Sequence, residues 1–475
     1  MGGVDGLQLV PDLAVALPKP TGGGRTYTFR VRPAIRYSSG RRVGARDFRR
    51  ALERLFITGV NPVAAAYFDG IVGTEACAAA PRRCNLSRGI ATDERTRTVT
   101  FHLRAPDPDF LYKLALPPAF AVPPETRAKD VGRSSLPATG PYMRARTGRS
   151  SVTFVRNPYF HEWSKAAQPA GYADRIIVAV TTSARRAVRE VERGNSDVAL
   201  LGVPPDLQHE VQTQYASQAH VNPLARVTYL FMNTRVPPFD DVRVRRAVNF
   251  AVDRAAAARA SAGFVGAEPT CQILPPDFRG YQRYCPYTLH PGANEWSAPD
   301  LSRARRLVAA SGTRGALVTM WEPERHRGEA RLATALLRSL GYRTRTKRVS
   351  DDVYYNPSTG PLNPNRRAQA GLSAWTADLP AASNYFGVLF SCRAPNFPHF
   401  CDRRIEKQIG RALALQSSDS YRANRLWARI DRAVVDEAPV APLYTLKEVD
   451  ITSRRVGNFQ YNPQWGVLFG QLWLR

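Results

Sequence analysis

Six cysteines are the residues of this chain with the clearest chemistry, and they fall into three local pairs. The pairs are Cys77 with Cys84, Cys271 with Cys285, and Cys392 with Cys401. Each pair lies in a segment rich in Pro, Arg or aromatic residues, where a disulfide would close a short surface loop. Pairing of nearest neighbours therefore predicts three disulfides and an oxidising compartment. Zinc held by Cys392, His399 and Cys401 is the alternative, although neither a second CxxC nor a clustered His supplies further ligands.

The residue patterns of catalysis are absent from the sequence. Seven His are dispersed between His102 and His399, without the HExxH or paired spacing of a catalytic metal site. Neither a GxSxG nucleophile sequence nor a Walker A phosphate loop occurs, and the GGG at 22–24 precedes a strand instead of following one. We therefore expect no enzymatic activity, no cofactor and no catalytic metal.

The charge balance is strongly basic and comes mostly from arginine. Lys and Arg number 67 against 40 Asp and Glu, which gives a formal net charge of +27 and a pI near 10.4. Such a balance would suit nucleic acid, an anionic membrane surface or acidic ligands. The arginines are spread from Arg25 to Arg475 instead of forming one basic block. We therefore expect a solvated basic surface and no nucleic-acid partner.

Apolar stretches give no sign of a membrane span or a secretion signal. No run of about eighteen apolar residues occurs, so we expect no membrane-spanning helix. Residues 1–20 lack the basic start, apolar centre and small-residue cleavage site of a secretion signal. This conflicts with the oxidising compartment that the paired cysteines imply.

Length and hydrophobic periodicity indicate an α/β protein of two or three lobes. A chain of 475 residues exceeds the usual size of one domain. Alternating residues over 26–32 predict a strand, and apolar positions at helical spacing over 47–56 predict an amphipathic helix. The strand pattern returns at 98–106, and the Pro-rich residues 118–138 read as a connecting segment.

The middle of the chain alternates strand and helix patterns. Residues 139–160 indicate a hairpin. The apolar run at 174–180, the helical segment after it and SDVALLG at 196–202 predict a βαβ unit whose strands are covered on both faces. Residues 300–349 predict helix, strand, helix and strand in turn, and hence a second α/β lobe.

Four segments together resemble one known family, the family 5 extracellular solute-binding proteins that serve dipeptide, oligopeptide and nickel importers. TYTFRVRPAIRYSSGRRVGARDF at 26–48 is similar to the family's first block. Three further segments resemble later blocks of the family: TGPY followed by RNPYF, MNTRVPPFDDVRVRRAVNFAVDR at 232–254, and AWTADLP at 374–380. The four blocks keep the family's order and cover most of the chain, which makes the resemblance specific.

The resemblance implies an α/β fold of the periplasmic-binding-protein-like class II type, with two lobes that close on the ligand, hinge strands and an extra α/β domain. Carried onto this chain, residues 1–138 form the extra domain, 139–255 with 440–475 form lobe I, and 256–439 form lobe II. The resemblance also implies that the chain is N-terminally incomplete. The missing portion would hold an export signal and a lipid-anchoring Cys.

In peptide-binding members of the family, the Asp of a W-x-x-D sequence pairs with the ligand's α-ammonium. The matching residues here are Trp375 and Asp378, with Tyr385 as an aromatic pocket wall and Tyr67 as a further cleft-facing candidate. This chain continues with Leu-Pro-Ala-Ala where the family often has DYPDP, so the positioning of an ammonium would differ. The alternative is structural, with Trp375 and Tyr385 in the core and Asp378 capping a turn.

The resemblance therefore implies the substrate-binding subunit of an ABC importer, which captures peptides or similar small solutes outside the membrane and delivers them to permease subunits. We expect a monomer in the periplasm or at the outer face of the cell membrane, lipid-anchored as a lipoprotein. The alternative is the ligand-sensing domain of a transcriptional regulator with the same fold, whose DNA-binding region would lie upstream of Met1.

Overall fold

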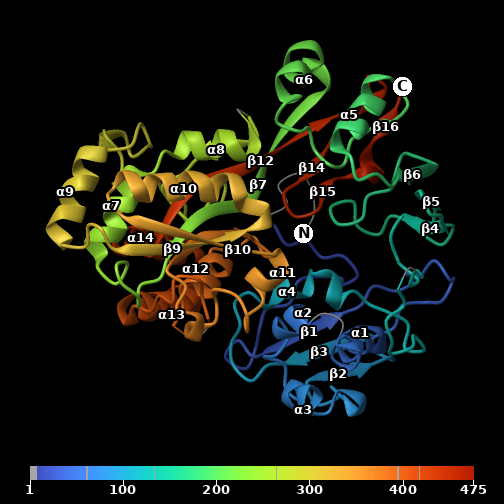
Figure 1. The fold of residues 1–475 in the computed structure, drawn as a ribbon. Coiled ribbons are helices and arrows are strands. Elements are labelled where there is room, and N and C mark those ends of the chain that lie inside the picture. Colours follow the sequence, from blue (N-terminus) through green and yellow to red (C-terminus); the bar gives the residue numbers. More distant parts are fainter. Residues whose placement is uncertain (1–7, 60–61, 133, 264, 393–394, 417) are drawn as a thin grey trace. The chain divides into compact units, whose positions relative to one another are not determined.

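The computed structural model describes residues 8–475, apart from 60–61, 133, 264, 393–394 and 417. The chain divides into two compact units. The first unit runs to Ser183 and includes Arg454–Arg475, and the second unit spans Ala184–Ser453. Figure 1 labels the elements of both units, which are described separately below.

A small antiparallel sheet in the first unit is covered by an amphipathic helix. The strands lie in the order β1-β3-β2, and Leu52 and Phe56 of α1 are buried in one cluster with Phe101 of β3. The strand and the amphipathic helix expected in the first block are thereby confirmed. The elements are β1 (Thr26–Arg30), α1 (Arg46–Thr58), α2 (Pro62–Ala66), α3 (Thr74–Ala79), β2 (Ile90–Asp93), β3 (Thr98–His102) and α4 (Phe110–Leu114).

A second antiparallel sheet of the first unit has the order β4-β5-β6. Its strands β4 (Tyr142–Thr147) and β5 (Ser151–Arg156) form the hairpin expected from the sequence, and β6 (Arg175–Ala179) pairs with β5. Four short strands complete the unit near the C-terminus: β13 (Val456–Gly457), β14 (Tyr461–Asn462), β15 (Gly466–Val467) and β16 (Trp473–Leu474).

The βαβ unit predicted over 174–202 is wrong. Strand β6 pairs antiparallel with β5 at the edge of its sheet, and Ile177 is 62% exposed. Helix α5 (Ala184–Glu192) follows as expected, but residues 196–202 form no regular strand and contribute one bridge, from Val198 to Thr452. A continuous apolar run resembles a strand buried on both faces, whereas here only alternate residues of β6 face the interior of the unit.

The second unit is built on a six-stranded mixed sheet with the order β10-β9-β11-β7-β12-β8. Its strands are β7 (Ala219–Met232), β8 (Ala267–Pro269), β9 (Leu317–Pro323), β10 (Arg343–Val349), β11 (Ala370–Thr376) and β12 (Val440–Ile451). Its remaining helices are α6 (Gln208–Gln214), α7 (Val242–Ala251), α8 (Arg254–Ala262), α9 (Leu301–Ser311), α10 (Arg327–Ser339), α11 (Asp351–Tyr355), α12 (Ser383–Leu389), α13 (Arg403–Gln416) and α14 (Ser420–Glu437). Two hydrophobic clusters contain side chains of alternate residues of β7, for example Leu230 in one and Phe231 in the other.

The α/β lobe expected over residues 300–349 is confirmed within this unit. Strands β9 and β10 are parallel and are connected by α10, which contacts both of them (Figure 1). Leu337 of α10 is fully buried with Val318 and Met320 of β9. Parallel neighbours with a crossover helix need this βαβ arrangement, which the sequence periodicity indicated.

The division into units differs from the expected lobe boundaries. The expected boundary at 255/256 would separate β7 from β11, yet these strands pair over seven residues from Ala370↔Met232 to Thr376↔Arg226. Strand β12 pairs with β7, both expected in lobe I, but it also pairs with β8, which was expected in lobe II. Residues 184–255 therefore belong to the same sheet-based unit as 256–453, while the expected boundary at 138/139 lies inside the first unit.

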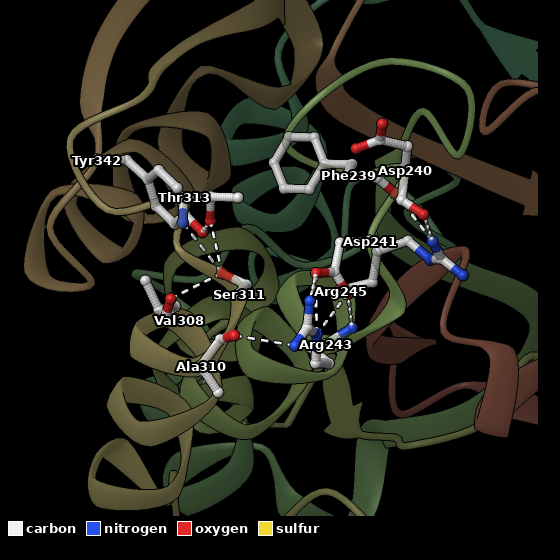
Figure 2. Close-up of polar contacts among 10 residues, drawn as sticks. All are labelled: Phe239, Asp240, Asp241, Arg243, Arg245, Val308, Ala310, Ser311, Thr313 and Tyr342. Carbon is white, nitrogen blue, oxygen red and sulfur yellow. Dashed lines mark hydrogen bonds and ion pairs between the residues drawn. The ribbon is translucent and has the colours of Figure 1, made fainter.

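The block at 232–254 contains the N-terminal cap of helix α7, the whole of α7 and the first residue of α8. Asp241 caps α7 by accepting from the backbone N–H of Arg243 at 2.7 Å, and the Arg243 side chain donates to the Ala310 carbonyl at 2.9 Å (Figure 2). The buried Arg245 donates from Nη1 to the Phe239 carbonyl at 2.9 Å and from Nη2 to the Glu437 carbonyl at 2.8 Å. This block thus stabilises the second unit by satisfying main-chain carbonyls at the ends of its elements.

All three predicted disulfides are present, between Cys77 and Cys84, Cys271 and Cys285, and Cys392 and Cys401. They close loops of 7, 14 and 9 residues in sequence separation. In the part of the chain that the structure describes, no helix combines the length and apolar character needed to cross a bilayer.

A fully buried carboxyl, Asp431 of α14, holds the loop that carries Cys271. Its Oδ2 accepts from Gln272 Nε2 at 2.8 Å and its Oδ1 from the Ile273 N–H at 3.3 Å. Burial raises the pKa of Asp431 from 3.8 to about 7. The folded protein therefore holds a proton on this carboxyl at pH values where the unfolded chain has released it.

Stability is accordingly expected to fall as pH rises from about 4 to about 7 through Asp431, and to lose nothing further through this group above that range. A rise in the pKa of Asp431 of only half that size would correspond to about 2 kcal/mol of unfolding free energy. Asp431→Asn keeps a neutral acceptor at this position, so its unfolding free energy should lose this part of the pH dependence. Urea unfolding of both proteins across the range measures the difference, with the exposed Asp277→Asn as control. Parallel pH profiles for wild type and Asp431→Asn would contradict the assignment.

Candidate functional site

The W-x-x-D segment begins in β11 and ends in the loop before α12. One buried amide organises it, because Asn384 Oδ1 accepts from Trp375 Nε1 at 3.2 Å and from the Asp378 backbone N–H at 2.9 Å. Asn384 is 4% exposed, whereas Trp375 and Asp378 are both partly exposed. The indole of Trp375 and the main chain of Asp378 are therefore held in place by one shared acceptor.

The apolar continuation after Asp378 anchors this loop in the core. Leu379, Ala381 and Ala382 are all buried, and Ala377 and Ala382 belong to the same hydrophobic cluster as Phe386. Where the family often has the polar sequence DYPDP, this chain therefore has apolar residues that pack in the core. Sequence reasoning missed Asn384, although an amide inside the otherwise mostly apolar run 379–390 is the kind of signal that indicates a buried structural polar group.

Charged and aromatic groups lie at the same end of the sheet as Trp375. Arg226 of β7 is in register with Thr376, next to Trp375. Trp375 and Tyr355 pack against one hydrophobic cluster, and a cavity of about 530 Å³ is lined by Arg325, Asp351, Asp352, Tyr355 and Asn356.

The charges in this cavity are largely engaged with one another. Arg325 Nε donates to Asp351 Oδ2 at 2.8 Å, and its guanidinium carbon lies 4.7 Å from the Tyr355 ring centroid. Burial acts to raise the pKa of Asp351, but the hydrogen bonds from Arg325 outweigh it and hold that pKa below its usual value. Burial raises the pKa of Tyr355 to about 12, so its hydroxyl stays protonated at neutral pH.

Tyr385, expected as a pocket wall, lies in the core. Its side chain has no exposed surface, and its hydroxyl donates to the Ala225 carbonyl at 2.7 Å. Its ring meets Phe278 edge to face with centroids 5.1 Å apart. This geometry favours the packing alternative for Tyr385, since no part of the ring is accessible to a solute.

Tyr67 belongs to the first unit. It is partly exposed and packs against the hydrophobic cluster that contains Phe68 and Ile71. Its role as a ligand contact stays a prediction.

The first unit also contains a large, mainly apolar cavity of about 1280 Å³. Aromatic side chains from both of its sheets and from its C-terminal segment contribute to the wall, among them Phe29, Phe101, Phe154 and Trp465. Arg54, Lys165 and Gln168 supply polar groups at this wall, and two carboxylates, Asp12 and Asp130, also line it. Apolar cavities with a few polar groups are the usual form of a small-molecule site, and this volume is above the common range of about 300 to 1,000 Å³.

The zinc alternative at Cys392, His399 and Cys401 is excluded by the disulfide between the two cysteines. Zinc binds thiolates, which a disulfide does not provide. His399 instead bonds through Nε2 to the Pro361 carbonyl at 2.9 Å, and burial lowers its pKa. Among the described residues, no group of three or more His, Cys, Asp and Glu is arranged to hold a metal ion.

Known proteins similar to this chain are solute-binding proteins. The deoxycholate-binding periplasmic protein YgiS of Escherichia coli K12, itself described as probable, is 25% identical over 95% of this chain and 83% of its own length. The glutathione-binding protein GsiB of Salmonella typhi is 23% identical over 94% of this chain and 82% of its own. Among solved structures, the clavulanic acid biosynthesis oligopeptide binding protein 2 superposes with a TM-score of 0.87 at 25% identity, covering 98% of this chain and 86% of that one.

The family model for bacterial extracellular solute-binding proteins, family 5, matches residues 8–397. These matches confirm the expected fold class and give no support to the alternative of a regulator's sensor domain. The match covers most of the chain, including the W-x-x-D segment and the block that starts α7. The chain therefore belongs to the family 5 bacterial extracellular solute-binding proteins.

Proposed function

We propose that this solute-binding protein captures small peptides through their free amino terminus and delivers them, chemically unchanged, to the permease subunits of an ABC importer. The observation that supports this most directly is the fixed pair of Trp375 and Asp378 over Asn384. A carboxylate with its main chain already held in place loses little conformational freedom on binding, so more of its attraction for an ammonium contributes to affinity.

The partial burial of Asp378 favours an ammonium ligand. An ion pair in a partly desolvated setting is much stronger than the same pair in water. Trp375, which is partly exposed and bonds to the same Asn384 oxygen, has an aromatic ring of the kind that attracts cations. Glutathione, named for the relative GsiB, carries such an amine, and so do the di- and tripeptides named for a relative in Pseudomonas aeruginosa, the di/tripeptide-binding protein 5, itself described as probable. Peptides of this size are therefore the first ligand class to test.

The family and the disulfides support an extracytoplasmic location for the proposed function. We place the mature protein outside the cytoplasmic membrane, as a monomer tethered there by a lipid anchor. Three disulfides fit an oxidising compartment.

The second ligand class is an amphipathic acid, which the apolar cavity of the first unit favours. The relative YgiS is named for deoxycholate, a rigid amphipathic carboxylate. Lys165 and Arg54 at the cavity wall are cations that such a carboxylate could meet. This class needs no amine, so its binding would not depend on Asp378.

Ligand-dependent thermal stabilisation tests the proposal. Purified protein is melted with dipeptides, tripeptides, glutathione and deoxycholate, each at high concentration. A ligand present at about 100 times its Kd should add about 2.7 kcal/mol of stability and raise the melting temperature by several degrees. A shift with a peptide supports the amine site, and a shift with deoxycholate alone supports the second class. The peptide proposal fails if no free-amine compound shifts the melt.

A further inference from the structure

Positive charge is concentrated in one stretch of the second unit. Residues 301–348 contain twelve Lys or Arg against three Glu, a net charge of +9 out of the chain's +27. About a third of the net charge thus lies on about a tenth of the chain. This stretch contains helices α9 and α10 and strands β9 and β10. The two strands are parallel and lie at one end of the six-stranded sheet.

In this stretch the cationic side chains are exposed, whereas two of the three carboxylates are buried. All twelve cationic side chains belong to exposed residues. Glu322 and Glu329, in contrast, are 3% and 5% exposed, and Glu329 accepts from the Tyr444 hydroxyl at 2.6 Å. The one exposed carboxylate, Glu324, pairs with Arg327. The surface of the stretch is therefore more positive than its sequence count indicates.

The cations follow two neighbouring elements. Arg343, Arg345 and Lys347 alternate along β10 and so lie on one side of it, about 6.6 Å apart from one to the next. Arg331 and Arg338 are exposed on α10, and Arg338 Nε donates to Thr344 Oγ1 at 2.6 Å. Thr344 alternates with the three strand cations, so α10 covers the opposite face of β10 and the two groups of cations flank the free edge of this strand. Figure 1 shows α10 lying beside β10.

Arg314 extends this surface past the start of β10, because its side chain packs against Gly341. We call Arg314, Arg331, Arg338, Arg343, Arg345 and Lys347 the basic rim. Within the described part of the chain, none of these six has a carboxylate within ion-pair distance. Their positive charge is thus available to an external partner.

Protection of a sheet edge explains the cations on β10 but not those on α10. Strand β10 is an edge strand, and Lys and Arg on an edge discourage pairing with other chains. The cations on the outer face of α10 do not serve that purpose, since a helix has no open edge. Exposed leucines also lie within the rim: Leu317 is in register with Arg343, and Leu332 is adjacent to Arg331.

We propose that the basic rim binds the anionic phospholipid surface of the membrane. Basic side chains near such a surface contribute about 1 kcal/mol each, and Leu317 and Leu332 supply apolar groups that can enter the headgroup region. Single-stranded nucleic acid would need exposed aromatic rings for stacking. Two aromatic residues beside the rim, Trp321 and Tyr342, are each 3% exposed, and Trp321 lies under Lys347, whose Nζ is 3.7 Å from the ring centroid.

Vesicle sedimentation with the full chain tests this proposal. Vesicles contain equal parts of phosphatidylglycerol and phosphatidylcholine, or phosphatidylcholine alone. Wild type should sediment with the anionic vesicles at low salt, and binding should weaken between about 50 and about 500 mM NaCl as the charges are screened. The variant Arg343→Glu/Arg345→Glu/Lys347→Glu should bind about 100-fold more weakly, from about 1 kcal/mol for each lost cation.

The matched control is Arg82→Glu/Arg83→Glu/Arg88→Glu, three exposed positions of the first unit that change the net charge equally. Its binding should stay within about twofold of wild type if the rim is the contact surface. The neutral variant Arg343→Gln/Arg345→Gln/Lys347→Gln should also lose binding. It separates loss of binding from any folding defect that charge reversal causes, and its melting temperature shows whether it is folded.

Three outcomes would overturn the proposal. The first is wild type that leaves anionic vesicles unbound at low salt. The second is a control triple that weakens binding as much as the rim triple, which would indicate net charge alone. The third is binding of a DNA oligonucleotide that requires the rim while vesicles do not bind, which would assign the surface to nucleic acid. None of these outcomes involves the peptide site, so the proposed function is tested separately.

Discussion

Asp378→Asn is expected to raise the Kd for a free-amine peptide about 100-fold, or about 2.7 kcal/mol, while the fold is retained. Removing one partner from a fully buried ion pair costs about 3 to 5 kcal/mol, and the partial exposure of Asp378 reduces that figure. The substitution keeps the shape of the side chain. It also keeps the backbone N–H that donates to Asn384 at 2.9 Å, so the loop should hold its position.

The ligand's amine provides the decisive comparison. The peptide that gives the largest thermal shift is measured by calorimetry in its free form and in its N-acetylated form, against both wild type and Asp378→Asn. If the carboxylate pairs with the ammonium, acetylation should weaken binding to wild type strongly and binding to the variant little. Asp277→Asn, at an exposed position of the same unit, should behave as wild type. Equal effects of acetylation on both proteins would mean that Asp378 is not the partner of the amine.

Local patterns carried the sequence predictions that the structure confirms. Each cysteine lies close in sequence to its partner, as the 7-residue separation of Cys77 and Cys84 illustrates. The alternation of helix and strand over 300–349 needed only short-range periodicity to be recognised, and it forms the parallel end of the sheet. The amphipathic helix α1 was predicted on the same basis.

Long-range pairing explains what could not be predicted. Strand β7 pairs with β11, more than 130 residues later, and β8 pairs with β12, more than 170 residues later, so no local pattern could show that one sheet joins the expected lobes. The register of Trp375 against Val227 and the capture of Asp378 by Asn384 depend on that sheet and on the fold of α12. Tyr385 shows the same limit, because an aromatic residue looks alike in sequence whether it faces a ligand or the core.

Arg254, the last residue of the block that starts α7, should be among the most sensitive positions for stability. It is fully buried, and its guanidinium donates to main-chain carbonyls of three other segments: Pro442 at 2.8 Å, Thr270 at 3.0 Å and Tyr287 at 3.3 Å. Burial lowers its pKa to about 9, which still leaves it protonated at neutral pH. The resemblance identified this residue as part of a family block, and the structure gives it a stabilising role: it joins α8, the loop of Cys271 and β12.

Arg254→Met should therefore lower the unfolding free energy by about 4 kcal/mol, because several buried carbonyls lose their donor at about 1 to 3 kcal/mol each and only part of that loss is relieved by relaxation. Arg254→Lys should recover about half, since an ammonium has three donors and cannot reproduce the planar fork of a guanidinium. Urea unfolding followed by circular dichroism measures both variants. Arg259→Met, at an exposed position of the same helix, controls for the loss of charge from α8. If Arg254→Met unfolds at the same urea concentration as Arg259→Met, the carbonyls around Arg254 are satisfied in another way and the stabilising role is wrong.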